Sequence, residues 1–266
     1  MSTSISFSSE DARRDLAAAG LVRYEDFVTC TTGEVVARSG DSETRRLTIK
    51  GAQSECECFL KVYKFAARSR RWAVQDDKAS TEAANYRHLE KLGVGVPDLI
   101  CHGSRGGLFL LRDSFILTRA VPNAVALDTF VDGRWPRAEC GVADSVRSTI
   151  LDASCALVRR MHDGQFFHVD LQWRNLLVSQ STDGAIRLLV IDSSRGGMRE
   201  TGVRRQHGRL RDLASLAKDA RTRMKRREML RWFRAYLGVR RLTTEHRLMI
   251  QTIERDRDLK DNSSRS

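Results

Sequence analysis

The 266-residue sequence has few prolines, no long apolar run and no Cys-x-x-Cys pair. Its three prolines, Pro97, Pro122 and Pro136, are too few for a low-complexity linker protein. The longest stretch without a charged residue, Met1–Ser9, is far shorter than the roughly 20 apolar residues that cross a bilayer. No basic segment followed by an apolar one opens the chain, so we expect no cleaved secretory signal and a cytoplasmic location.

Cysteine and hydrophobic content point to a globular protein with a reduced interior. Hydrophobic residues make up 41% of the chain, which is too many for a disordered chain and enough for one large domain or two small lobes. Among the six cysteines, Cys56 and Cys58 share one face of a strand-like segment, where a metal is conceivable. We interpret all six as reduced thiols that serve as small hydrophobic residues, and we expect no structural zinc.

The positive charge is concentrated near the end of the chain. The formal net charge is +12, and residues 199–241 contain 15 Lys and Arg against four Asp and Glu, a surplus of 15 − 4 = +11. Such a block attracts polyanions. Its basic helices either form an ordinary solvated face or recruit the protein to the anionic inner face of the cytoplasmic membrane as a peripheral protein. Aromatic residues are sparse in the block, which disfavours nucleic acid as the partner.

The first half of the chain is rich in strand-like segments. Alternating residues predict strands over 34–38, 46–50, 56–64, 108–111 and 115–118, with a hairpin loop at Ser39–Ser42. Ser8 and Ser9 precede a short capped helix that ends before Gly20. Ser80 or Thr81 is the expected N-cap of a second helix, which runs to Leu92.

The second half is mostly helical. One apolar stripe of a long buried helix, ended by Gly164, consists of Val146, Ile150, Ala153, Leu157 and Met161. Two apolar strands follow, over 175–179 and 186–191, and the remainder is basic amphipathic helix. We therefore predict an α+β fold of two lobes, with an extension over 1–24, an N-lobe over 25–121 that contains an antiparallel sheet, and a mainly helical C-lobe over 122–266.

Polar residues surrounded by apolar ones mark the most informative segment, which runs from Phe166 to Val178. Asp170 precedes Asn175 by five residues, and Asp192 comes just after an apolar strand. Two carboxylates and an amide that meet at one point suit Mg²⁺ held against the phosphates of a nucleotide. A further carboxylate can orient an attacking hydroxyl and accept its proton.

Upstream, Lys61 lies in a predicted strand and Glu82 begins the next helix. In such an arrangement the carboxylate fixes a lysine that contacts phosphates.

The order of these residues resembles the catalytic core of protein kinases, because His-x-Asp-x4-Asn is followed by a strand that ends in Asp. The segments Gly93–Gly103, His168–Leu171, Val190–Gly196 and Arg209–Leu216 are most similar to the bacterial lipopolysaccharide kinase (Kdo/WaaP) family. This resemblance covers roughly residues 25–220. It implies a bilobal protein-kinase-like fold.

The resemblance implies a role for each matched residue. Asp170 is the expected catalytic base, and Asn175, a second catalytic candidate, ligates magnesium together with Asp192. Lys61 contacts the phosphates of ATP, with Glu82 as its ion-pair partner. Backbone groups of Thr118, Arg119, Ala120 and Val121 meet adenine. Asp212 supports the catalytic loop from below, and we expect His168 to be structural.

The implied activity is an ATP- and Mg²⁺-dependent transfer of phosphate to a heptose or Kdo hydroxyl of a lipid-linked glycan. The chain has no Gly-x-Gly-x-x-Gly loop, so Ser39–Ser42, with one glycine, is the only candidate phosphate loop. Ser193-Ser194 replaces the usual Phe-Gly. Phe59 stands where kinases keep a small residue, which leaves Lys64 as an alternative to Lys61. The alternatives are a kinase for protein Ser/Thr or for a small molecule, and a pseudokinase binding module. The sequence leaves the oligomeric state and the phosphorylated hydroxyl open.

Overall fold

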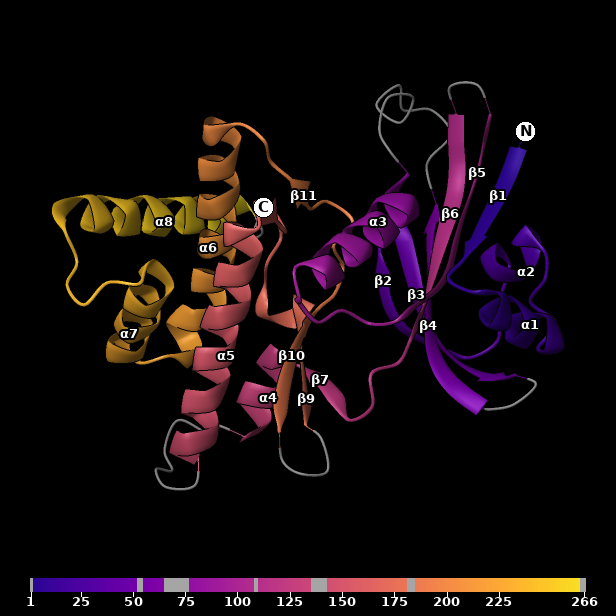
Figure 1. Ribbon diagram of the computed structural model, residues 1–266, viewed down its shortest axis with the longest axis horizontal. Coiled ribbons are helices and arrows are strands. Elements are labelled where there is room, and N and C mark those ends of the chain that lie inside the picture. The colour runs from indigo at the N-terminus through magenta and orange to yellow at the C-terminus, as the bar shows by residue number, and fades with distance from the viewer. Residues whose placement is uncertain are drawn as a thin grey trace. The chain divides into compact units, whose positions relative to one another are not determined.

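The computed structural model describes residues 2–51, 55–64, 77–107, 110–134, 143–180 and 185–263. The chain forms two compact units. Unit 1 comprises Met1–Arg87 and Pro97–Val121, and unit 2 comprises His88–Val96 and Pro122–Ser266. Strands dominate unit 1 and helices dominate unit 2 (Figure 1).

Unit 1 is organised around a six-stranded antiparallel sheet with strand order β1-β5-β6-β4-β3-β2. Its strands are β1 (Ser2–Phe7), β2 (Glu34–Ser39), β3 (Ser42–Lys50), β4 (Glu55–Lys64), β5 (Leu99–Gly107) and β6 (Leu110–Arg119). A two-residue turn at Gly40 and Asp41 joins β2 to β3, which confirms the predicted hairpin. The three predicted strands over 34–38, 46–50 and 56–64 lie within β2, β3 and β4.

The two faces of this sheet have different roles. Helices α1 (Glu10–Ala18) and α2 (Tyr24–Val28) cover one face, and Ser9 caps α1 as predicted. The core on that face contains Leu16, Tyr24 and Phe27 from the helices and Cys58, Leu60 and Val62 from β4. Because strand side chains alternate between faces, Lys61 and Tyr63 lie on the opposite face, where both contact Glu82 of helix α3 (Lys78–Lys91).

Unit 2 combines short sheets with five helices of the described chain. The strands are β7 (Ala124–Ala126), β8 (Phe166–Phe167), β9 (Leu176–Gln180), β10 (Ile186–Val190) and β11 (Gly197–Met198). The helices are α4 (Leu127–Arg134), α5 (Ala143–Asp163), α6 (Gly202–Arg223), α7 (Arg226–Leu237) and α8 (Thr244–Ser263). A single 3₁₀ turn, Trp173–Asn175, precedes β9. Ile150, Leu157 and Met161 of the predicted stripe are buried in α5.

Two local predictions were wrong. Helix α3 begins at Lys78, and its first N–H groups donate to the side chain of Asp77, so neither Ser80 nor Thr81 is the N-cap. The segments 108–111 and 115–118 are not two strands: β6 is continuous from Leu110 to Arg119, while residues 108–109 lie outside the described residues. Asp113, which lies between the two predicted segments, accepts hydrogen bonds from Arg105 of β5 and from Tyr24 of α2.

An apolar cavity of about 290 Å³ lies within unit 2. Helices α5, α6, α7 and α8 provide most of its lining, including Leu151, Leu213, Leu216, Met229, Phe233 and Ile253. Trp173 and Leu176, which flank Asn175 in the chain, also line it. In the part of the chain that the structure describes, no helix has the length and apolar character needed to span a membrane.

Candidate nucleotide and catalytic site

Lys61 and Glu82 come together in unit 1. The ammonium nitrogen of Lys61 lies 3.7 Å from Oε2 of Glu82, and the side chains are 17% and 3% exposed. Lys64 is exposed and belongs to the other face of β4, because it is an odd number of residues away from Lys61. The structure therefore pairs Lys61, and not the alternative Lys64, with the glutamate of α3.

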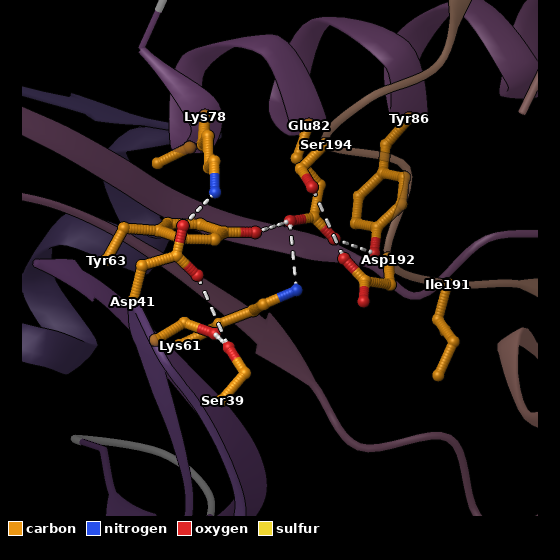
Figure 2. Close-up of polar contacts among 12 residues, drawn as sticks. Ser39, Asp41, Lys61, Tyr63, Lys78, Glu82, Tyr86, Ile191, Asp192 and Ser194 are labelled. Carbon is orange, nitrogen blue, oxygen red and sulfur yellow. Dashed lines mark hydrogen bonds and ion pairs between the residues drawn. The ribbon is translucent and has the colours of Figure 1, made fainter. Parts of the chain in front are cut away.

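Two tyrosines bind the Glu82 carboxylate more closely than Lys61 does. The hydroxyl of Tyr63 donates to Oε2 over 2.7 Å, and that of Tyr86 donates to Oε1 over 2.7 Å. Figure 2 shows both hydroxyls directed at the carboxylate, one from β4 and one from the next turn of α3. Each carboxylate oxygen of Glu82 thus has a phenolic donor, which offsets the cost of burying the group.

The hairpin tip between β2 and β3 is fixed by a charge from α3. Lys78 pairs with the carboxylate of Asp41 (Figure 2). The hydroxyls of Ser39 and Ser42 lie 2.8 Å apart. Partial burial raises the pKa of Asp41, but the hydrogen bond and charge of Lys78 outweigh this and hold that pKa below its usual value. This tip is the candidate phosphate loop identified in the sequence. It has only one glycine, and the ion pair between Lys78 and Asp41 anchors it to α3.

The predicted adenine segment, Arg119–Val121, leaves the sheet at the end of unit 1. The N–H of Arg119 donates to the carbonyl of Asp98, and the N–H of Ala120 donates to the carbonyl of Glu57. Both donors are used within unit 1. Neither of these two N–H groups is therefore available to the adenine that the segment is predicted to contact.

In unit 2, backbone contacts bring Asp170, Asn175 and the segment before Asp192 together. The side-chain amide of Asn175 donates to the carbonyl of Asp170 over 2.8 Å. The N–H of Ile191 donates to the carbonyl of Asn175 over 3.0 Å, so Asp192 follows directly after a residue bonded to Asn175. His168 contacts the Ile191 carbonyl through Nε2 at 2.9 Å, which confirms its structural role.

Asp212 holds the start of this loop from helix α6. Its side chain is fully buried and accepts the N–H of His168 at 2.8 Å and the N–H of Val169 at 2.6 Å. Val169 has a φ of 72°, a costly conformation for a β-branched residue. The two hydrogen bonds to Asp212 stabilise this backbone, so the predicted support of the loop by Asp212 is confirmed.

A second aspartate of α6 holds the 3₁₀ turn that leads to Asn175. Asp219 accepts the N–H of Trp173 over 2.9 Å and lies 3.5 Å from the guanidinium of Arg223. Burial raises the pKa of the Asp219 carboxyl, although the Trp173 N–H and Arg223 act in the opposite direction. Asp212 and Asp219 are seven residues apart, on the same side of the helix, and together they anchor both ends of the loop.

The donor chemistry of this loop fits a hard cation. Asn175 uses its amide nitrogen on the Asp170 carbonyl, so the amide oxygen is the atom available for a metal by chemical type. Asp192 adopts a left-handed backbone with a φ of 56° and accepts the Ser194 hydroxyl at 3.4 Å (Figure 2). Carboxylate and amide oxygens with few protein ligands are what Mg²⁺ takes when phosphates supply the rest. Among the described residues, no three His, Cys, Asp or Glu side chains cluster to form a dedicated metal cage.

Sequence reasoning did not find Tyr63, Tyr86 or Asp219. A signal was present for each: Tyr63 is two residues beyond Lys61 on the same strand face, and Tyr86 is one helical turn beyond Glu82. Asp219 lies two turns beyond Asp212. Spacing relative to an already suspected residue would have identified all three.

Together, an antiparallel sheet unit with a Lys–Glu pair and a helical unit with an Asp–Asn loop define a bilobal protein-kinase-like fold. The chain is similar to the solved structure of WaaP in complex with acyl carrier protein, with a TM-score of 0.68 and 22% identity over 96% of this chain and 98% of that chain. It is also similar to the kinase domain of maize sucrose-induced receptor kinase 1 bound to AMP-PNP, with a TM-score of 0.42 and 16% identity over 71% of this chain and 57% of that chain. The likeness to WaaP confirms the predicted fold class.

The model of the lipopolysaccharide kinase (Kdo/WaaP) family matches residues 32–236. The chain belongs to this family, as its motifs predicted, and is therefore a kinase. No curated protein matches it in sequence.

Proposed function

We propose that the protein transfers the γ-phosphoryl group of ATP to a sugar hydroxyl, of heptose or Kdo, on a lipid-linked glycan. The observation that carries this proposal is the loop from His168 to Asn175, which is strained at Val169 and anchored at both ends by buried or half-buried carboxylates. Such construction holds polar groups in one geometry, which is the main requirement of phosphoryl transfer. Family membership supports the choice of a lipopolysaccharide acceptor.

In this proposal each group has a defined task. The acceptor oxygen forms a bond to the γ-phosphorus, the bond from that phosphorus to the β-γ bridging oxygen breaks, and ADP leaves. Asp170 accepts the proton of the attacking hydroxyl. Asn175 and Asp192 would hold magnesium, which neutralises charge on the phosphates. Lys61 contacts those phosphates, with Glu82 as its partner.

The test is phosphotransfer from ATP to purified lipid-linked core glycan, compared with a generic protein and a panel of small alcohols. We expect Asp170→Ala to lower the rate by roughly 10²–10⁴-fold, the usual contribution of a positioned general base. Asp163→Ala is the matched control, because Asp163 also pairs with an arginine one turn away and is 65% exposed. A folded Asp170→Ala protein with full activity would overturn the assignment.

The acceptor panel also separates the alternatives. Transfer to protein or to small alcohols, but not to the glycan, would support a different acceptor on the same fold. Binding of Mg-ATP without turnover on any acceptor would support a pseudokinase. Reduced turnover of the glycan in the absence of Mg²⁺ is expected if Asn175 and Asp192 have the proposed role.

We further propose an acyl carrier protein as a partner, since the similar WaaP structure was solved with one. The apolar cavity of unit 2 supports this proposal, because its volume and its leucine, methionine and aromatic lining suit a fatty-acyl chain. Calorimetry with acylated and unacylated carrier protein tests it. We expect only the acylated form to bind tightly, and we expect Ala217→Phe, which fills the cavity, to remove that difference. Equal binding of both forms would contradict the role of the cavity.

The protein is also proposed to act at the inner face of the cytoplasmic membrane, where a lipid-linked acceptor is anchored. The basic surplus of residues 199–241 supports attraction to anionic lipid.

A further inference from the structure

The buried Glu82 carboxylate accepts hydrogen bonds from two tyrosine hydroxyls in addition to its ion pair with Lys61. Glu82 is 2% exposed, and Tyr63 and Tyr86, the residues that bond it, are 2% and 3% exposed. Both phenolic bonds measure 2.7 Å, whereas the Lys61 nitrogen is 3.7 Å from Oε2 of Glu82, beyond hydrogen-bond distance. The neutral donors, and not the lysine, therefore fix the carboxylate.

Tyr63 also contacts the lysines through its ring. The Lys61 nitrogen lies 5.0 Å and the Lys78 nitrogen 5.5 Å from the ring centroid. Ammonium groups at this distance over an aromatic face are attracted by the ring. Tyr63 thus donates to Glu82 through its hydroxyl and attracts the ammonium groups of Lys61 and Lys78 through its ring (Figure 2).

We infer that Tyr63 and Tyr86 are positioning residues for nucleotide binding: they satisfy the buried Glu82 carboxylate so that Lys61 remains directed to, but not captured by, Glu82 and can contact phosphate. This inference rests on the proposed function of Lys61. Without a phenolic donor, the buried carboxylate must find another partner, and the nearest cation is Lys61. When the Lys61 ammonium is bound tightly by Glu82, it is not available to contact the phosphates.

The test measures the affinity of the full-length protein for Mg-ATP by calorimetry, without an acceptor. We expect Tyr63→Phe and Tyr86→Phe each to weaken binding by roughly tenfold, which corresponds to the loss of one hydrogen bond to a charged group. Tyr24→Phe is the matched control. Tyr24 is 3% exposed in the same unit and donates to the carboxylate of Asp113 over 2.7 Å, so its loss has the same structural cost.

A double-mutant cycle with Glu82→Gln distinguishes the proposed positioning role of the two tyrosines from a purely structural role. If the tyrosines act through Glu82, each Tyr→Phe change has little further effect on Mg-ATP affinity once residue 82 is uncharged. Full additivity with Glu82→Gln would overturn the inference, as would wild-type affinity in both single variants, or an equal loss of affinity in Tyr24→Phe. A wild-type protein that binds no Mg-ATP would instead overturn the proposed function itself, and the inference with it.

Discussion

Two carboxylates, Glu82 and Asp212, are buried and accept short hydrogen bonds from several fixed donors. Glu82 accepts two phenolic hydroxyls, and Asp212 accepts two backbone N–H groups and lies 3.2 Å from Nε2 of His162. His162 in turn contacts the Tyr236 hydroxyl at 2.8 Å. A buried acid that is satisfied by several fixed donors is costly to alter, because every donor loses its partner at the same time.

We expect Asp212→Asn to lower the free energy of unfolding by about 3 kcal/mol. The amide places an N–H where Asp212 now accepts one, so the His168 or Val169 N–H loses its acceptor and the strained Val169 backbone loses its support. Urea denaturation at constant m-value measures the change. Asp152→Asn is the control, since Asp152 is 66% exposed and pairs with the exposed Arg231, and its effect should stay below about 1 kcal/mol. Similar losses in both variants would contradict the account of Asp212.

At the scale of residues, motif spacing identified the polar groups that kinases carry in a fixed order along the chain. It found Lys61 and Glu82, which the structure pairs, and Asp170 and Asn175, which it joins; their roles remain predictions. It did not find the tyrosines around Glu82, because a tyrosine in a strand or a helix is usually interpreted as core. Their function becomes visible only when the hydroxyl partners are known.

At the scale of elements, strands β1 and β5 were not predicted. Strand β1 is the edge of the sheet and consists largely of serine and threonine, and β5 contains three glycines and an arginine, so both look like loops. One of these glycines has a steric reason. A Cβ at Gly103 would lie 2.6 Å from both the Phe115 ring and the carbonyl of Ser4, so β1 can pair closely with β5 only if residue 103 has no side chain.

Helix α7 is attached to α5 by a half-buried ion pair. Arg147 donates to Glu228 over 2.6 Å, and Glu228 also accepts the N–H of Lys225 over 2.6 Å, which caps α7. Burial raises the pKa of Glu228, but the bonds from Arg147 and Lys225 outweigh it, so the pKa is below its ordinary value. The pair therefore stabilises the folded protein when Glu228 is ionised.

We expect Glu228→Gln to lower the free energy of unfolding by about 1–3 kcal/mol at neutral pH. Because the folded pKa is below the unfolded one, the difference from wild type is fully present above the unfolded pKa, about 4.3, and shrinks as the pH falls through the folded pKa. Urea titrations at a series of pH values measure this. Glu90→Gln, at an exposed position of α3, is the control. A difference that grows on acidification would contradict the assignment.

At the scale of the molecule, charge is distributed very unevenly. Residues 199–241, which contain α6 and α7, hold a surplus of +11 out of the formal net charge of +12. Many of these basic side chains are exposed, including Arg204, Lys225, Arg227, Arg234 and Arg241. Composition alone located this surplus. The apolar cavity that α6 and α7 line together with α5 and α8 was not foreseen, because its lining residues come from segments far apart in the sequence.

Exposed basic residues on α7 and beyond it should bind anionic lipid surfaces. We expect the protein to sediment with phosphatidylglycerol vesicles at about 0.1 M salt and to be released at about 1 M, where the screening length falls to about 3 Å. The variant Arg227→Gln, Arg234→Gln, Arg241→Gln should bind roughly 100-fold more weakly, since each basic residue near such a surface contributes about 1 kcal/mol. Three exposed arginines outside the block, Arg13, Arg14 and Arg38, provide the matched triple control. Equal losses in the two triple variants would mean that net charge alone drives the binding, and equal binding to neutral phosphatidylcholine vesicles would remove the electrostatic basis for a membrane-surface kinase.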